Sequence, residues 1–170
     1  MGALVATVPV GLTKRSPPHA SHGYRKGLLL GSASMIVRKH MIDELVHANL
    51  RDGLHQTYRR MRERDIRHMP VIDDDGRLVG IISERDVLRP NFVDTEPNTS
   101  GAFVLDNKVR VEEAMTPNPI TLHTDDGLGK ALDLFLKHKF GALPVVDENE
   151  TLVGILSTID LLQVLKDQLG

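Results

Sequence analysis

The amino-acid sequence predicts a mixed α/β (α+β) protein in which two tandem βαββα units pack on each other as a pseudo-symmetric pair. Three observations predict this fold: an internal repeat, the same order of periodic segments in both copies, and a composition that can build a core. The chain has 170 residues, of which 41% are hydrophobic. Because a unit of about 50 residues buries too little surface to be stable alone, the two copies are expected to form one folding unit.

The repeat aligns the chain with itself, without a gap, at an offset of 74 positions. Residues 69–73 match residues 143–147, and residues 78–88 match residues 152–162. Such self-similarity constrains the architecture more strongly than local propensity does. The register extends upstream through three further pairs: Val37 with Val111, Met41 with Met115, and Asp52 with Asp126.

Each copy begins with a short extended segment and a helix. Val46 and Ile120 lie in the extended segments, and each segment is followed by an Asp-Gly pair that ends the strand and opens the helix. The apolar residues of each helix recur at helical spacing on one face and are expected to be core. They are Leu54, Tyr58 and Met61 in copy one, and Leu128, Ala131, Leu132 and Phe135 in copy two.

A hairpin follows each first helix. Its β-rich runs are Pro70–Asp73 and Leu78–Ser83 in copy one, and Pro144–Asp147 and Leu152–Ser157 in copy two. In both copies a four-residue polar turn joins the two runs, which is typical of a hairpin. A second helix follows each hairpin, and the last one is expected at roughly residues 158–169.

The predicted organisation is a leader at residues 1–34, a first unit at 35–88, a linker at 89–108 and a second unit at 109–170. The leader contains no Asp or Glu and is rich in small residues. It is expected to be a disordered leader or the product of a start codon assigned too early, with Met35 as the true first residue; a targeting peptide is the alternative. The linker is rich in Pro and Asn and lacks periodicity, which suits an exposed connection.

Composition excludes several classes of function. The chain carries 21 basic and 23 acidic residues, so it lacks the positive charge that a nucleic-acid-binding protein needs. It contains no cysteine, which excludes disulfides and thiolate metal sites and is compatible with the reducing cytoplasm. No apolar run approaches the roughly 18 residues that a membrane span requires. We therefore expect a cytoplasmic protein without nucleic acid or membrane insertion.

The sequence also lacks the marks of an enzyme. It has no Gly-rich phosphate loop of the Walker or dinucleotide type, and no thiol. His40, His47 and His55 do not have the i, i+4 spacing of a two-histidine metal site on one helix. We expect no catalytic residue, no metal ligand and no required cofactor.

The duplicated motifs resemble the CBS domain family, whose tandem pairs are called Bateman modules. The resemblance rests on an apolar-Pro-apolar-apolar-Asp strand, an apolar-Val-Gly-Ile-apolar strand and a closing Ser-x-x-Asp, each present twice, and it covers about residues 36–165. It implies a stand-alone CBS pair that binds AMP, ADP, ATP or S-adenosylmethionine in the cleft between its copies. Such a module would signal to a regulated partner protein, which the sequence does not identify.

The resemblance implies that Asp86 and Asp160 accept hydrogen bonds from ribose hydroxyls, with Ser83 and Ser157 near the phosphate. A carboxylate can accept from both hydroxyls of a cis-diol, and a helix N-terminus presents free N–H groups to an anion. Ser-x-x-Asp is also close to a helix capping box, which is the alternative role. Because a capping box favours Glu or Gln at the last position, we prefer the ligand role, and the two roles can coexist.

The resemblance extends the phosphate side to Arg67, His68, Arg85 and Thr158, with a solvated helix residue as the alternative role of Arg85. Arg67 and His68 are expected to face the site of the opposite copy, built on Ser157 and Asp160, which is the better candidate because Glu84 would repel a phosphate at the first site. The residues implied on the adenine side are Val46, Met69 and Pro70 in copy one, and Ile120, Leu143 and Pro144 in copy two. Ordinary core is the alternative role for all six, and for Val46 and Ile120 it is the preferred one.

The terminal helix carries more apolar residues than a helix exposed on one side should have. Leu161, Leu162, Leu165 and Leu169 need cover from the other copy or from a second chain. We expect a homodimer, since tandem CBS pairs commonly dimerise through their helices and symmetric dimers are the commonest oligomers. A protein-interaction or dimerisation module without a small ligand is the alternative function.

Overall fold

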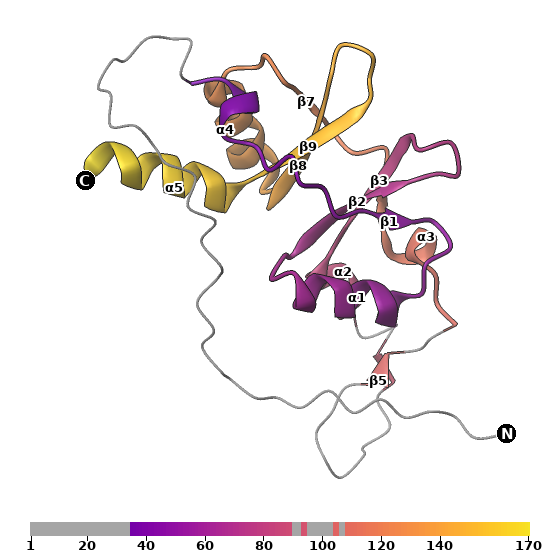
Figure 1. Ribbon diagram of the computed structural model, residues 1–170. Helices are drawn as coiled ribbons and strands as arrows, with labels where there is room; N and C mark the ends of the chain where they lie inside the picture. Colours follow the sequence, from indigo (N-terminus) through magenta and orange to yellow (C-terminus); the bar gives the residue numbers. More distant parts are fainter. Residues whose placement is uncertain (1–34, 90–92, 95–103, 106–107) are drawn as a thin grey trace, which may run out of the picture.

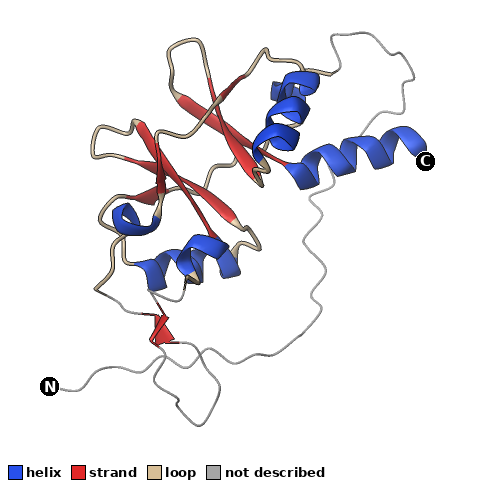
Figure 2. Cartoon of the chain, turned by 180° about the vertical axis from the view of Figure 1, so that it is seen from behind, coloured by secondary structure: helices blue, strands red, loops and turns tan. Residues whose placement is uncertain are grey.

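The computed structural model describes residues 35–89, 93–94, 104–105 and 108–170 (Figure 1). The predicted leader and most of the predicted linker lie outside the described residues. Two units, each a small sheet with helices packed against it, lie side by side (Figure 2). The α/β fold class is confirmed.

Both copies show the predicted order βαββα. In each, the first strand is parallel to the second, which forms an antiparallel hairpin with the third. The elements of copy one are β1 (Ala48–Asn49), α1 (Leu54–Glu63), β2 (His68–Ile72), β3 (Leu78–Ser83) and α2 (Glu84–Val87). Those of copy two are β7 (Leu122–His123), α4 (Leu128–His138), β8 (Ala142–Val146), β9 (Leu152–Ser157) and α5 (Thr158–Leu169).

Short additional elements lie before copy one and between the two copies. They are the 3₁₀ helix η2 (Val37–Lys39), the strand pair β4 (Val93–Asp94) and β5 (Val104–Leu105), the helix α3 (Val111–Ala114) and the strand β6 (Thr116–Pro117). Val46 and Ile120, which were predicted to lie in the first strands, each precede the start of β1 or β7 by two residues. None of the helices in the described part of the chain is long and apolar enough to span a membrane.

The helical stripes point into two cores, with one exception. Leu54 and Met61 of α1 and Leu128, Ala131 and Phe135 of α4 are buried. Tyr58 is half-buried and packs against the first core. The prediction that Leu132 is core is wrong, because 48% of this residue is exposed. Successive side chains of an α-helix differ in direction by about 100°. Because the Ala131 side chain points into the core, that of the next residue, Leu132, points away from the centre of the buried face.

The two copies exchange segments. Val37 and Met41, which precede copy one, pack in the core of copy two. Val111 and Met115, which precede copy two, pack in the core of copy one. Backbone hydrogen bonds fix the exchange, since β6 pairs with β3 and Ile42 bridges to β9. The predicted units at residues 35–88 and 109–170 therefore have the right order along the chain. They do not coincide with the two hydrophobic cores, because each core includes residues that precede the opposite copy.

In each exchanged segment, a methionine side chain packs against a glycine of the other copy. The Met115 sulfur lies where a side chain at Gly80 would begin, and the Met41 sulfur occupies the same place at Gly154. The carbonyl oxygens of Thr116 and Ile42 approach the same two glycines, each at 3.2 Å from the position of a Cβ atom. Only glycine leaves room for this contact, which explains why the repeat carries a Gly in the middle of each third strand.

Gly154→Ala is expected to lower the free energy of unfolding by about 1–3 kcal/mol, the usual range for an overpacked core. The new methyl group would stand 2.5 Å from the Met41 sulfur and close to backbone. Gly129→Ala is the matched control, because Gly129 lies in α4 with nothing within 4 Å of an added Cβ atom. The control should be neutral or stabilising by up to about 1 kcal/mol. Urea unfolding followed by circular dichroism measures both, and equal midpoints would contradict the packing account.

Candidate functional site

The two Ser-x-x-Asp motifs lie where β3 and β9 turn into α2 and α5. In each motif the Asp Oδ2 atom accepts two hydrogen bonds from the Ser, one from the backbone N–H and one from the hydroxyl. These distances are 3.0 and 2.6 Å for Ser83 with Asp86, and 2.7 and 2.7 Å for Ser157 with Asp160. The Ser Oγ in turn accepts from the Asp backbone N–H at 3.3 Å in both copies.

Both motifs are therefore complete capping boxes. The preference of capping boxes for Glu or Gln does not hold here, since the shorter Asp closes the box equally in both copies. The structural role that the sequence left as an alternative is thus present. It uses only one oxygen of each carboxylate, which leaves the other available.

The second carboxylate oxygen distinguishes the two copies. Asp86 Oδ1 accepts a hydrogen bond from Arg89 at 2.6 Å, and the Asp86 side chain is only 15% exposed. Within the described residues, Asp160 Oδ1 has no such partner, although the side chain is half-buried. Asp160 can accept further hydrogen bonds, whereas Asp86 is already neutralised. The sequence analysis did not single out Arg89, whose role depends on the short turn that ends α2.

His68 bridges the two copies. Its imidazole lies directly against Gly141, at the place where a side chain would begin. The Gly141 carbonyl oxygen accepts the Thr158 backbone N–H at 3.1 Å, so His68 lies close to the start of α5. Burial lowers the pKa of His68 below its ordinary value of 6.5; Arg67 also lowers it, Asp86 raises it and Arg85 lowers it.

The charges around His68 only partly match the predicted pairing. Arg67 and His68 were expected to face the site of Ser157 and Asp160, and His68 does reach copy two. The charged groups that shift the pKa of His68, however, all belong to copy one; they are Arg67, Asp86 and Arg85. Arg67 and Arg85 are exposed and, among the described side chains, neither is in an ion pair.

A small apolar pocket of about 120 Å³ lies between the copies. Ala142 lines it and is the register partner of Ser157, which places the pocket next to the start of α5. Ile81 comes from copy one, so both copies contribute. Phe140 also lines it, a residue that the sequence analysis did not single out. The predicted adenine-side residues of copy two all line this pocket, namely Ile120, Leu143 and Pro144. The preference for Ile120 as core is wrong, because 40% of this residue is exposed.

The corresponding residues of copy one are placed as core. Met69 is fully buried in the first hydrophobic cluster, and Val46 packs against that cluster. Pro70 is buried in β2. This arrangement matches the alternative role that the sequence analysis gave to these three residues.

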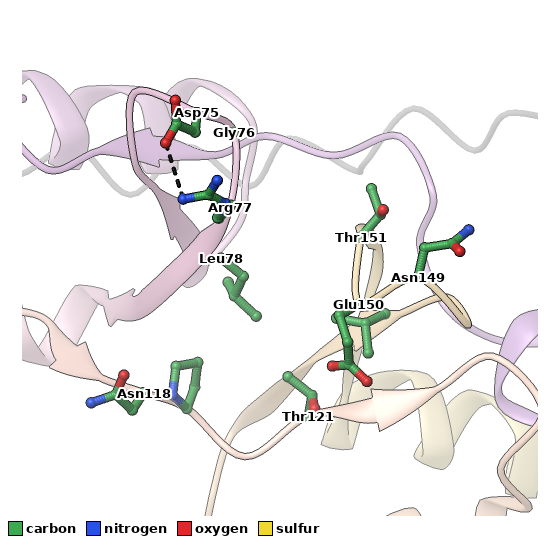
Figure 3. A pocket seen from close by; sticks show the side chains of 11 residues that line it. Asp75, Gly76, Arg77, Leu78, Asn118, Thr121, Asn149, Glu150 and Thr151 are labelled. Atoms are coloured by element: carbon green, nitrogen blue, oxygen red, sulfur yellow. Dashed lines mark ion pairs between the residues drawn. The ribbon is translucent and has the colours of Figure 1, made fainter.

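A larger cleft of about 660 Å³ opens between the turns of the two hairpins (Figure 3). Asp75 and Arg77, which form an ion pair of 3.0 Å, lie on one side, and Asn149, Glu150 and Thr151 lie on the other. None of the predicted site residues lines this cleft, so its size alone does not identify the binding site. In the described part of the chain, no group of three or more His, Asp or Glu side chains could hold a metal ion.

Sequence comparison identifies related proteins. A family model described as the CBS domain matches residues 37–90 and 111–167. The chain is 27% identical over 122 residues to the uncharacterized protein YlbB of Bacillus subtilis, an alignment that covers 71% of this chain and 76% of YlbB. It is 31% identical over 99 residues to L-aspartate semialdehyde sulfurtransferase of Methanocaldococcus jannaschii, and this match spans only 17% of that protein.

Solved structures share the fold. The CBS domain pair of protein MJ0100, in complex with 5′-methylthioadenosine and S-adenosyl-L-methionine, is similar with a TM-score of 0.66 and 25% identity, over 78% of this chain and 97% of that one. CBSX2 in complex with AMP is similar with a TM-score of 0.64 and 27% identity, over 79% of this chain and 98% of that one. Both alignments cover more of the chain than either copy of the repeat contains.

The lowered pKa of His68 predicts a pH dependence of stability. Because the folded pKa lies below 6.5, the unfolded chain binds more protons at pH values between the two. The free energy of unfolding should therefore fall as the pH drops from above 6.5 through the folded pKa. Asp126 and Asp147, whose pKa values are lowered from 3.8, titrate below this window. Urea unfolding of the wild type and of His68→Gln between pH 7.5 and 5 should give a shallower slope for the variant, and identical slopes would refute the assignment.

Proposed function

Because the chain belongs to the CBS domain family, with matches at residues 37–90 and 111–167, we propose that it is a regulatory module that binds an adenosine-containing ligand between its two CBS domains. The observation that carries this proposal is the apolar pocket beside the start of α5. Ile120, Leu143 and Pro144 line it, and its Ala142 is the register partner of Ser157, which is hydrogen-bonded to the Asp160 carboxylate.

The pocket fits the base of such a ligand and not the whole molecule. Small-molecule sites usually measure about 300–1,000 Å³, so a pocket of about 120 Å³ accommodates only the buried part of a nucleoside. Its apolar walls suit the two faces of a purine ring, and Phe140 adds an aromatic surface. The rest of the ligand would then extend along β9 toward Ser157, which is paired with Ala142 of the pocket.

The ribose would be bound by Asp160. Its Oδ2 atom is held by Ser157, which fixes the orientation of the carboxylate, while Oδ1 can accept from the ribose hydroxyls. Hydrogen bonds to an ionised group are stronger than those between neutral groups. Asp86 is the weaker candidate because Arg89 already occupies its second oxygen. A single dominant site follows from this difference.

The charges in the cleft favour an anionic ligand. Arg67 and Arg85 are exposed and lie near enough to His68, which reaches copy two, for their positive charges to lower its pKa. AMP, ADP and ATP carry the phosphates that such a region attracts, whereas S-adenosylmethionine carries a positive sulfonium. The MJ0100 and CBSX2 structures provide precedents for both ligand types in CBS pairs.

We propose that the ligand acts by a population shift and without catalysis. A ligand that contacts both copies favours one relative orientation of them and transmits this preference to a regulated partner protein. The regulatory unit is proposed to be a homodimer, which would cover the apolar residues exposed on α4 and α5. The absence of cysteine is compatible with the cytoplasm, the compartment proposed here.

Calorimetry with AMP, ADP, ATP and S-adenosylmethionine tests the ligand site. Asp160→Asn keeps the shape and the capping oxygen but removes the charge, and it is expected to weaken binding by roughly 10- to 100-fold, the equivalent of about 1.5–3 kcal/mol. Asp86→Asn is the matched control and should leave the affinity within about threefold, well below the tenfold that corresponds to 1.4 kcal/mol. A ligand at one hundred times its dissociation constant should also raise the free energy of unfolding by about 2.7 kcal/mol.

The outcomes separate the competing functions. If Asp86→Asn abolishes binding and Asp160→Asn does not, the dominant site is that of copy one. If none of the four compounds binds or raises the unfolding temperature, the protein-interaction module is the correct function. The exposed apolar side chains of α4 and α5 are the observation that favours this second candidate.

A further inference from the structure

Sulfur in this chain is confined to methionine. The sequence has six methionines and no cysteine, so a peroxide has no thiol to oxidise here. Met61 and Met69 are fully buried in the first core, which shields them from an oxidant in solution. Met35, Met41 and Met115 are only half-buried and are therefore accessible to a small oxidant.

Met41 and Met115 differ from Met35 in what their sulfur atoms contact. Both pack the sulfur directly onto a glycine of the opposite copy. The Met35 sulfur instead accepts a hydrogen bond from the Gln168 amide at 3.4 Å. An oxygen added to the Met35 sulfur would thus have a donor beside it, whereas an oxygen added to either of the other two would stand at the contact between the copies.

The contact in copy two leaves no room for an added oxygen. At Gly154, the Met41 Cγ atom lies 3.0 Å and the Ile42 carbonyl oxygen 3.2 Å from the position of a Cβ atom. Ile42 and Ile155 exchange both of their backbone hydrogen bonds here, at 2.9 and 3.0 Å. A sulfoxide oxygen would therefore face a carbonyl oxygen, while the N–H groups of these two residues are already in use.

The contact in copy one has the same form. At Gly80, the Met115 Cε atom lies 3.3 Å and the Thr116 carbonyl oxygen 3.2 Å from the position of a Cβ atom. Next to each methionine the pairing with the other copy is short, because β6 pairs with β3 over two residues and Ile42 forms a single bridge. Loss of the sulfur contact would therefore weaken a large part of what holds these two places together.

We infer that Met41 and Met115 form a redox-sensitive modification site, at which oxidation to the sulfoxide by a peroxide loosens the two exchanged segments. A lone pair of the thioether sulfur attacks one peroxide oxygen. The O–O bond breaks as the S–O bond forms, and the proton of the attacked oxygen passes to the departing one, which leaves as water. The sulfur loses two electrons and the peroxide gains them. Methionine sulfoxide reductases reverse the step, so the site can act as a switch.

Peptide mapping by mass spectrometry tests the selectivity of the site. The full chain is exposed to hydrogen peroxide, and the rate of oxidation is measured at each methionine. Met41 and Met115 are expected to be oxidised at least about tenfold faster than Met61 and Met69, since susceptibility follows exposure. Equal rates at all four positions, or faster oxidation of the two buried methionines, would overturn the inference.

Urea unfolding links the modification to the contact between the copies. Oxidation of the wild type is expected to lower the midpoint by about 1 M urea, and treatment with both epimer-specific sulfoxide reductases should restore it. The double variant Met41→Leu, Met115→Leu keeps the packed volume without an oxidisable sulfur, so peroxide should leave its midpoint unchanged. Met35→Leu is the matched control and should respond as the wild type does. The inference is wrong if the double variant shifts as much as the wild type, or if the doubly oxidised wild type does not shift.

Hydrogen exchange followed by NMR distinguishes loosening from general unfolding. The N–H groups of Ile42 and Ile155 should lose protection on oxidation, whereas that of Asp73, which donates to the Arg77 carbonyl at 2.9 Å within one hairpin, should keep it. A uniform loss of protection would count against the inference. None of these measurements uses a nucleotide, so their outcome is independent of the proposed ligand.

A glutamine substitution provides a second test that requires neither peroxide nor the double leucine variant. Met115→Gln places a polar side chain of similar length on Gly80 and should lower the urea midpoint of the untreated chain. Met35→Gln is the control and should leave the midpoint within error of the wild type, since Gln168 remains beside it. Equal midpoints for the two variants would contradict the inference.

Discussion

The fold depends on one contact that is made twice, the packing of a methionine sulfur onto a glycine of the other copy. Met41 packs onto Gly154 and Met115 onto Gly80, so neither core closes without the segment that precedes the opposite copy. Because the chain must then cross from one sheet to the other, residues 116–121 run through the space between the copies. This crossing segment lines both the apolar pocket and the larger cleft. The pocket and the cleft between the copies are thus a consequence of the exchange of segments between the two cores.

The two copies keep the same backbone but have different chemistry. Arg89 neutralises Asp86 while Asp160 retains a free oxygen. His68 fills the space above Gly141, whereas the residue matching His68 in copy two is Ala142, which has no side chain long enough to return the contact. A symmetric scaffold therefore carries one dominant candidate site and one apolar helical face, both in copy two. A duplicated unit can thus keep the same fold in both copies while the side chains at matching positions differ in chemistry.

The sequence predicted the fold because the repeat and the local periodicity report which elements exist and in which order. It could not predict the exchange of segments. Met41 and Met115 match each other in the repeat in either case, whether each packs against its own copy or against the other copy. Periodicity also assigned Leu132 to the core, because it identifies an apolar stripe but not the edge of that stripe. Arg89 and Phe140 were missed for a related reason: their roles depend on where a helix ends and on which residues of the other copy lie nearby.

The helix α5 connects the candidate site with the apolar face. Its first turn holds Asp160 in a capping box. The exposed side chains Leu162, Leu165 and Leu169 follow along the helix, and Leu169 lies roughly 14 Å from Asp160 at about 1.5 Å per residue. Under the proposed function, a ligand that contacts Asp160 and a partner that contacts these exposed side chains would both act on α5. Coupling between ligand and partner would then require no long chain of side chains.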